Sequence, residues 1–231
     1  MTFPSHLALT HATGIQKNQP VAQFEIGAYR NFVYLILDWS KKKAALVDPH
    51  SGMGPVLKTL TDQGFELTSI LLTHSHWDHI AGLPELSHSL AQVPIYVHPL
   101  DEHRIRDQGK TTLPIHSLQD QQIILVGGLE IEVMHTPGHS PGECCFFLRS
   151  QTPYLFTGDT IFIRDCGRTD LEGGNDLAMF KSIQKIKALP SETIILPGHH
   201  YKTECASTLE VELRESPPFQ CKTANELAQL P

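Results

Sequence analysis

No apolar segment of this 231-residue chain approaches the length of about 20 residues that a membrane-spanning helix requires. The first 20 residues also lack the apolar core of a signal peptide. Cysteine is scarce: an odd count of five, without an export signal, indicates reduced thiols rather than a disulfide framework. These absences predict a cytoplasmic protein that does not associate with a membrane.

Basic residues are outnumbered, with 18 Lys and Arg against 25 Asp and Glu, which gives a formal net charge of −7. An acidic chain does not favour binding to nucleic acid, so a nuclease is disfavoured as well. Low-complexity tracts and internal repeats are also lacking. The remaining composition, 40% hydrophobic and 19% charged residues, is typical of a globular enzyme of one or two domains.

Metal-binding side chains, by contrast, are concentrated in the segment His-Ser-His-Trp-Asp-His at residues 74–79, which follows a short apolar run. Residues two apart on an extended chain project to the same side, so His74 and His76 can bind one ion together. The chain then turns and directs Asp78 and His79 elsewhere. This arrangement predicts two adjacent ions rather than one closed structural site.

Three further candidate ligands lie beside glycines at the ends of apolar runs. They are His139 in a Pro-Gly-His sequence, Asp159 in a Thr-Gly-Asp sequence and His199 in a final Gly-His. Loops at strand ends, where the backbone turns sharply, are common positions for functional side chains. We therefore expect these three residues to join the cluster at residues 74–79.

The complete set, in this order, resembles the metallo-β-lactamase superfamily over residues 20–200. The resemblance implies an α/β fold, the αββα sandwich, in which two mixed β-sheets pack together with helices on the outer faces and metals at one edge. In that family one ion is bound by residues matching His74, His76 and His139, the other by those matching Asp78, His79 and His199, and the residue matching Asp159 bridges both.

The apolar patterning is compatible with this fold. We expect strands at residues 31–38, 44–48, 69–73, 93–97, 122–126, 129–135, 143–148, 153–157 and 192–196. We expect helices at 55–63, at 84–91 and from Asn175 or Asp176 onward, the last with an apolar face of Leu177, Phe180, Ile183 and Ile186. Residues 99–116 are expected to form loops.

The chain is predicted to divide into a catalytic domain, residues 1–204, and a short helical extension, residues 205–231, packed on it. Ser207 and Thr223 each precede a glutamate at capping-box spacing, which predicts two short helices separated by the proline pair at 217–218. The extension can also form a subunit contact. A homodimer is therefore a hypothesis, although no sequence motif supports it.

Two divalent ions bound by imidazoles and carboxylates, with room for water, lower the pKa of that water toward ~7 and supply a hydroxide nucleophile. Zinc is the expected metal, with iron and manganese as alternatives. Asp78 is predicted to act both as a ligand and as the catalytic group that orients the hydroxide. A thiolate leaves without an acid because a thiol pKa is about 8.5, and no residue is marked as a proton donor, which favours thioester substrates.

The segment after Asp159 resembles hydroxyacylglutathione hydrolases (glyoxalase II), because it contains Cys-Gly-Arg at 166–168 and is followed later by Tyr201. The resemblance implies that Arg168 and Tyr201 bind the glutathione part of a small-molecule thioester such as S-lactoylglutathione. Arginine suits a carboxylate because it donates two parallel hydrogen bonds. A structural salt bridge between Arg168 and Asp170 is the competing interpretation.

A second resemblance points to a different reaction. Cys-Gly-Arg-Thr-Asp at 166–170 is similar to the persulfide dioxygenases, which bind one iron through positions matching His74, His139 and Asp159. The short stretch of 32 residues after His199 also fits this group better than the longer hydrolases. A mononuclear iron dioxygenase acting on glutathione persulfide is therefore the alternative, ahead of a lactonase or a non-catalytic metal-binding domain.

Four other residues receive structural interpretations. Asp48, before a proline, is predicted to anchor a loop rather than to act in catalysis. Cys166 has no evident general base nearby, so we expect a structural role rather than a nucleophilic one. The pair at residues 144–145 lies in an apolar run and is expected to belong to the core.

Overall fold

The computed structural model describes residues 15–90, 92–108 and 111–230. The first part of the chain forms a six-stranded sheet whose strands lie side by side in chain order. They are β1 (Val21–Ile26), β2 (Asn31–Asp38), β3 (Lys43–Val47), β4 (Glu66–Leu71), β5 (Ile95–Val97) and β6 (Ile115–Ser117). The β1–β3 strands pair antiparallel and β3–β6 pair parallel, so the sheet is mixed.

A second six-stranded sheet has the order β14-β13-β10-β9-β8-β7. Its strands are β7 (Ile123–Val126), β8 (Leu129–His135), β9 (Cys144–Arg149), β10 (Tyr154–Gly158), β13 (Ile194–Pro197) and β14 (Ser207–Thr208). Only β10 and β13 pair in parallel, so this sheet is mixed as well. A small hairpin of β11 (Ile161–Phe162) and β12 (Asp165–Cys166) follows β10.

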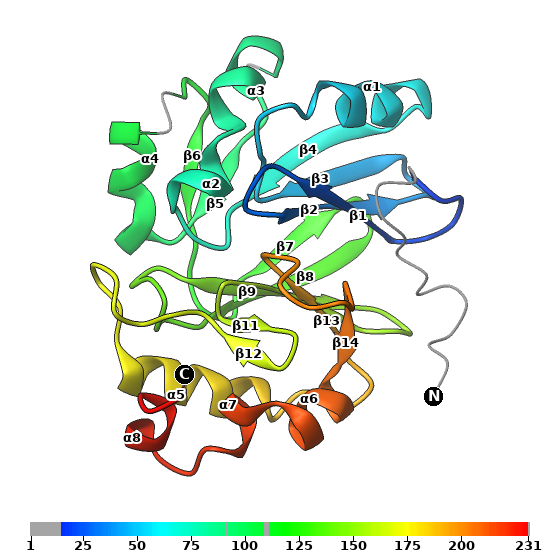
Figure 1. Ribbon diagram of the computed structural model, residues 1–231. Helices are drawn as coiled ribbons and strands as arrows, with labels where there is room; N and C mark the ends of the chain where they lie inside the picture. Colours follow the sequence, from blue (N-terminus) through cyan, green and yellow to red (C-terminus); the bar gives the residue numbers. More distant parts are fainter. Residues whose placement is uncertain (1–14, 91, 109–110, 231) are drawn as a thin grey trace.

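Helices cover the outer faces of both sheets (Figure 1). The first sheet carries α1 (Gly54–Asp62), α2 (Trp77–Ile80), α3 (Leu83–Ser89), the 3₁₀ turn η2 (Pro99–Asp101) and α4 (Glu102–Gln108). The second carries α5 (Asp176–Ile186), α6 (Leu209–Glu215), α7 (Pro217–Gln220) and α8 (Ala224–Leu227). The predicted αββα sandwich is confirmed. None of the helices in the described ranges has the length and apolarity to cross a bilayer.

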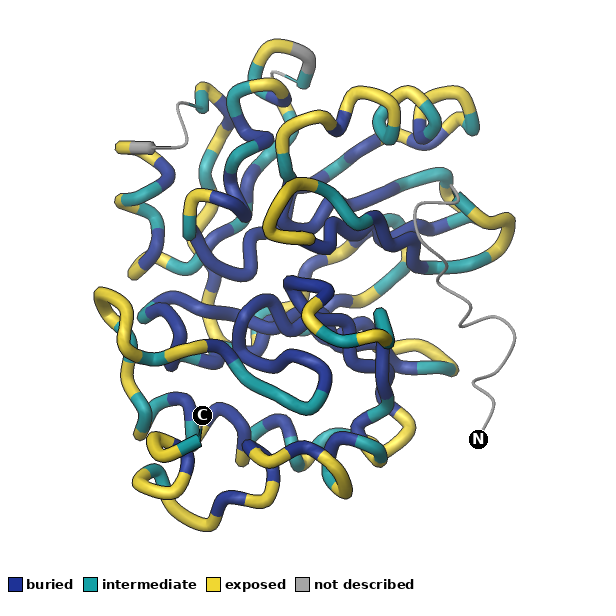
Figure 2. Tube along the Cα trace, viewed as in Figure 1, coloured by how far each residue is buried: buried dark blue, intermediate teal, exposed yellow. Residues whose placement is uncertain are grey.

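Buried residues are concentrated in the strands of the two sheets (Figure 2). One apolar cluster lies between the sheets, and the other two lie between each sheet and its helices. Strand β9 shows how one strand serves two layers, because Phe146 faces the central cluster and Phe147 faces the helices. The neighbouring Cys144 and Cys145 divide in the same way, and all five cysteines are free thiols, as predicted.

Some expectations for individual elements are wrong. The sequence did not mark β1, because the buried Gln23 interrupts its apolar pattern. Residues 99–116 are not all loop: they include η2, α4 and β6, which are too short to produce a periodic signal. In α5 the predicted cap Asn175 is confirmed, whereas Leu177 is exposed and Met179 is buried in its place.

The C-terminal helices also begin differently from the prediction. Thr208, not Ser207, caps α6, because Ser207 pairs with β13 as part of β14. Thr223 caps α8 as expected. Pro217 opens a further helix, α7, instead of separating two helices, since proline suits the first helical turn. A domain boundary after residue 204 stays a prediction. The predictions that concern residues 1–14 and residue 91 lie outside the described residues.

Candidate metal centre

The predicted metal ligands meet at one edge of the sandwich, although they come from four separate loops. The segment 74–79 follows β4, His139 lies between β8 and β9, Asp159 follows β10, and His199 follows β13. Ligand atoms of His74, His76 and His139 lie within 4.8 Å of one another, and so do those of Asp78, His79 and His199. These groups are the same two sets that the sequence predicted for two ions.

Asp159 lies between the two groups. Its Oδ2 is 3.5 Å from the Nε2 atoms of both His139 and His199, and its Oδ1 is 3.4 Å from His79 Nε2. The side chain is buried. A carboxylate that faces both sets of imidazoles in this way has the position required of a bridging ligand.

The donor atoms fit a bound cation. His139 Nδ1 donates a hydrogen bond to Arg168 O (2.8 Å) and His199 Nδ1 donates one to Tyr29 O (2.9 Å), and a carbonyl oxygen can only accept. Both rings therefore carry their proton on Nδ1 and present the Nε2 lone pair to the centre. His74 Nε2 and Asp159 Oδ1 are buried without any hydrogen-bond partner. Such atoms destabilise a fold by about 1–3 kcal/mol each unless something pairs with them, as a metal would.

The electrostatic environment keeps part of this cluster in the metal-binding form. Burial lowers the pKa of His74 well below its usual value and lowers the pKa of His76 to about 4. Burial would raise the pKa of Asp159, but the neighbouring His79 and His199 hold it well below its usual value. Neutral imidazoles and an ionised carboxylate are the forms that coordinate zinc or iron.

Asp48 orients the candidate ligand His79 by a hydrogen bond to the ring nitrogen that faces away from the centre. Its carboxylate accepts hydrogen bonds from Thr73 N (2.8 Å) and Thr73 Oγ1 (2.6 Å), which confirms the predicted role as a loop anchor. The same group accepts a hydrogen bond from His79 Nδ1 (3.0 Å), which leaves His79 Nε2 facing the centre. The sequence gave no sign of this second contact, because it depends on β3 and β4 lying side by side.

Asp101 ties together two of the ligand loops and was missed, because residues 99–116 were expected to be loop. Its buried carboxylate accepts hydrogen bonds from Ser75 N (3.0 Å), Ser140 Oγ (2.9 Å) and Gly142 N (2.9 Å). Ser75 separates two candidate ligands, and Ser140 follows His139. Asp101 therefore fixes the distance between the two halves of the first ligand group.

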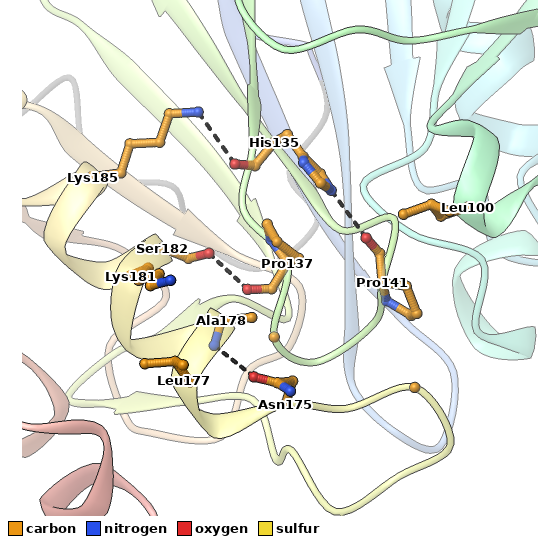
Figure 3. A pocket seen from close by; sticks show the side chains of 12 residues that line it. Leu100, His135, Pro137, Pro141, Asn175, Leu177, Ala178, Lys181, Ser182 and Lys185 are labelled. Atoms are coloured by element: carbon orange, nitrogen blue, oxygen red, sulfur yellow. Dashed lines mark hydrogen bonds between the residues drawn. The ribbon is translucent and has the colours of Figure 1, made fainter.

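The loop that carries His139 is also fixed on its outer side, against α5 (Figure 3). Ser182 Oγ donates a hydrogen bond to Pro137 O (2.7 Å). Gly138 packs so closely on the helix that a Cβ atom there would lie 2.5 Å from Met179 Cα. Only glycine allows this approach, which explains the Pro-Gly-His sequence in physical terms.

A cavity of about 630 Å³ opens beside His139 and Asp159. Arg168 and Tyr201, the predicted substrate-binding residues, both line it. Arg168 is exposed and donates two hydrogen bonds of 2.6 Å to Asp170, so the predicted salt bridge is confirmed. The salt bridge does not remove Arg168 from the cavity lining. The Tyr201 ring is half exposed and stacks on His199 at 4.8 Å.

Cys166 also lines this cavity but lacks the chemistry of a nucleophile. Burial raises the pKa of its thiol to about 12, so the thiol is neutral near pH 7. This environment agrees with the expected structural role. Asp78, the predicted catalytic group, is held in place because Asn31 Nδ2 donates a hydrogen bond to its Oδ2 (2.9 Å).

The sequence of residues 26–199 matches the profile of the metallo-beta-lactamase superfamily. The chain belongs to this superfamily. The match spans all seven candidate ligands, from the segment at residues 74–79 to His199. The resemblance predicted from these motifs is therefore confirmed at the level of the superfamily.

Two curated relatives are similar to this metallo-beta-lactamase superfamily chain over most of its length. A hydroxyacylglutathione hydrolase of Enterobacter sp. (strain 638) is 37% identical over 74% of this chain and 62% of its own length. The chain thus spans less than two thirds of that enzyme. The probable polyketide biosynthesis zinc-dependent hydrolase BaeB of Bacillus velezensis is 34% identical over 83% of each protein.

Two solved structures share the fold closely. ETHE1 from Myxococcus xanthus superposes with a TM-score of 0.77 at 25% identity, over 91% of this chain and 92% of that one. TTHA1623 in a di-iron-bound form superposes with a TM-score of 0.71 at 32% identity, over 84% of this chain and 98% of that one. The similarity to ETHE1 agrees with the predicted resemblance to persulfide dioxygenases, alongside that to the hydroxyacylglutathione hydrolases.

Proposed function

We propose that this protein is a metal-dependent hydrolase that cleaves a thioester, with a glutathione thioester such as S-lactoylglutathione as the first candidate. The observation that carries the proposal is the convergence of two ligand groups on Asp159, beside an open cavity. The similarity to a hydroxyacylglutathione hydrolase and to a zinc-dependent hydrolase supports the reaction class.

The proposed cofactor is a pair of divalent ions. One would be held by His74, His76 and His139, the other by Asp78, His79 and His199, with Asp159 contacting both. The relatives described as zinc-dependent and di-iron-bound support zinc first and iron as an alternative, and manganese accepts the same ligands. When bound, such ions lower the pKa of water and polarise a carbonyl group.

Within this scheme Asp78 has the catalytic role. Asn31 donates a hydrogen bond to its Oδ2 and thereby fixes the orientation of the carboxylate. Its other oxygen is then available to accept a hydrogen bond from the attacking water and to hold it toward the acyl carbon. A fixed acceptor of this kind aligns the nucleophile before the reaction begins.

The leaving group favours a thioester over an amide. An amine must be protonated as it departs, whereas a thiolate need not be. Burial, together with the charges of Asp159 and Asp78, raises the pKa of Tyr201 to about 12. Its hydroxyl therefore stays protonated near pH 7 and can donate a hydrogen bond, which suits the proposed role of Tyr201 and Arg168 in binding the polar end of the substrate.

The test is hydrolysis of S-lactoylglutathione and a panel of thioesters, followed by thiol release, and of lactones, followed by acid release, with zinc, manganese or iron restored to the apo-protein. We expect turnover that a chelator abolishes and metal restores. Absence of turnover with every substrate and every metal would rule out the proposal.

A second candidate is a mononuclear iron dioxygenase acting on glutathione persulfide, through His74, His139 and Asp159. The similarity to ETHE1 and the Cys-Gly-Arg-Thr-Asp sequence at 166–170 favour it. Oxygen uptake with glutathione persulfide in an iron-loaded sample would support this reaction. A protein that binds two zinc ions and shows no uptake when iron-loaded would remove it. A cytoplasmic location and a homodimer stay predictions.

A further inference from the structure

The C-terminal end of the chain forms one wall of the cavity beside the metal centre. Leu227, Ala228 and Leu230 line this cavity together with His139 and Asp159. We call these three residues the C-terminal wall. Its side chains are all apolar, and it lines the same cavity as two of the candidate metal ligands.

The C-terminal wall is anchored to the rest of the fold. Leu227 is buried in the apolar cluster between the second sheet and its helices, and Leu230 packs against the same cluster. Thr223 caps α8 by accepting a hydrogen bond from Glu226 N (3.2 Å). Because packing and a cap hold the helix, the wall is a preformed surface for a ligand.

The charges around the cavity offer one cationic contact to a ligand. Among the described residues that line it, Arg168 is the only lysine or arginine, and Asp170 already pairs with it. Asp165 lines the cavity as well. Phe162 and the neutral thiol of Cys166 add further apolar surface. Away from the metal ligands, the cavity therefore combines polar groups, among them Asp165, Tyr201 and the Arg168–Asp170 pair, with an apolar surface formed by Phe162, Cys166 and the C-terminal wall.

We propose that the C-terminal wall binds an apolar chain of the substrate, so that among thioesters the enzyme prefers those bearing an alkyl chain of several carbons, and S-lactoylglutathione is a weaker substrate than analogues with such a chain. This inference rests on the proposed thioester hydrolysis and specifies its substrate class. An alkyl chain contributes through burial of its methylene groups. The alkyl chain belongs either to the acyl group or to the thiol of the substrate, and two series of kinetic measurements distinguish these cases.

The first experiment measures binding without turnover. S-alkylglutathiones from methyl to octyl are unreactive thioethers, and calorimetry gives their affinity for the zinc-loaded protein. Full burial of a methylene group corresponds to about a fourfold gain in affinity, so we expect about twofold to fourfold per added methylene. An affinity that does not change with chain length would overturn the inference.

Kinetic measurements then show whether the alkyl chain belongs to the acyl group or to the thiol of the substrate. In one arm glutathione is the thiol and the acyl group lengthens from acetyl to octanoyl; in the other, acetyl is the acyl group and the thiol lengthens. A rise in kcat/KM in the first arm assigns the chain to the acyl side, and a rise in the second assigns it to the thiol side. No turnover in either arm contradicts the proposed function, whereas turnover that is flat in both arms contradicts the inference.

A matched pair of variants tests the wall itself. Ala228→Glu places a carboxylate in the cavity, and Gln229→Glu places the same charge on the next residue, which is also exposed but is not part of the cavity lining. We expect Ala228→Glu to weaken octylglutathione binding at least tenfold more than methylglutathione binding, and Gln229→Glu to affect both alike. Leu230→Ala should reduce the gain per methylene. Equal effects of the two glutamate variants on chain-length preference would contradict the inference.

Discussion

Replacement of Asp101 tests how the two halves of the first ligand group are held together. The carboxylate accepts three hydrogen bonds, from Ser75 N, Ser140 Oγ and Gly142 N, and it is fully buried. In Asp101→Ala all three donors lose their partner. An unsatisfied buried donor destabilises a fold by about 1–3 kcal/mol, so this variant should lose about 4 kcal/mol of stability.

Asp101→Asn is the milder change. An asparagine oxygen can replace one carboxylate oxygen, but its amide nitrogen must then face at least one of the donors. We expect a loss of about 2 kcal/mol from this mismatch and from the loss of charge assistance. Since the Ser75 and Ser140 loops carry candidate ligands, zinc affinity should fall about 10-fold to 100-fold, as is usual when groups that orient ligands are removed.

Urea unfolding of the apo-protein measures the first effect, and competition with a chelator measures the second. Asp107→Asn is the matched control, because Asp107 is exposed on α4 in the same region and should change stability by less than about 0.5 kcal/mol. If Asp101→Asn kept both the stability and the zinc affinity of the unmodified protein, the inferred link between the two ligand loops would be refuted.

Three further outcomes are expected. Gly138→Ala should lower stability by about 1–3 kcal/mol in thermal unfolding, because its Cβ would meet Met179 Cα at 2.5 Å. The pKa of His76 is about 4 when folded and about 6.5 when unfolded, so the unfolded apo-protein binds more protons and stability should fall as pH is lowered through this window in urea titrations. His199→Ala should reduce bound zinc from two ions to one per chain in metal analysis of the purified protein, and unchanged stoichiometry would contradict the assigned ligand set.

The candidate ligands could be predicted because they lie in short sequence motifs. Four of them occur within six residues, and the others stand beside glycines at strand ends. The contact of Asp48 with His79 and the role of Asp101 could not be predicted in the same way. They depend on hydrogen bonds between residues 26 to 41 positions apart in the chain, which exist only after the sheet and loops have assembled.

Most strands of both sheets were also predictable, because their apolar runs are continuous, whereas β1, whose pattern Gln23 interrupts, was not. The turn and helix at residues 99–108 were not, since a seven-residue helix is too short to produce a clear apolar period. The position of the C-terminal wall could not be predicted either. Leu227 and Leu230 line the cavity because α6, α7 and α8 bring the end of the chain back along α5 (Figure 1).

Titration of the apo-protein with zinc, with thiol release from a thioester followed at each addition, tests the two-ion hydrolase hypothesis most directly. We expect activity to rise to a maximum at two equivalents per chain, because both ligand groups and the shared Asp159 are needed. The hypothesis would be contradicted by activity that is complete at one equivalent, or by a protein that releases no thiol with zinc but consumes oxygen with persulfide when it holds one iron.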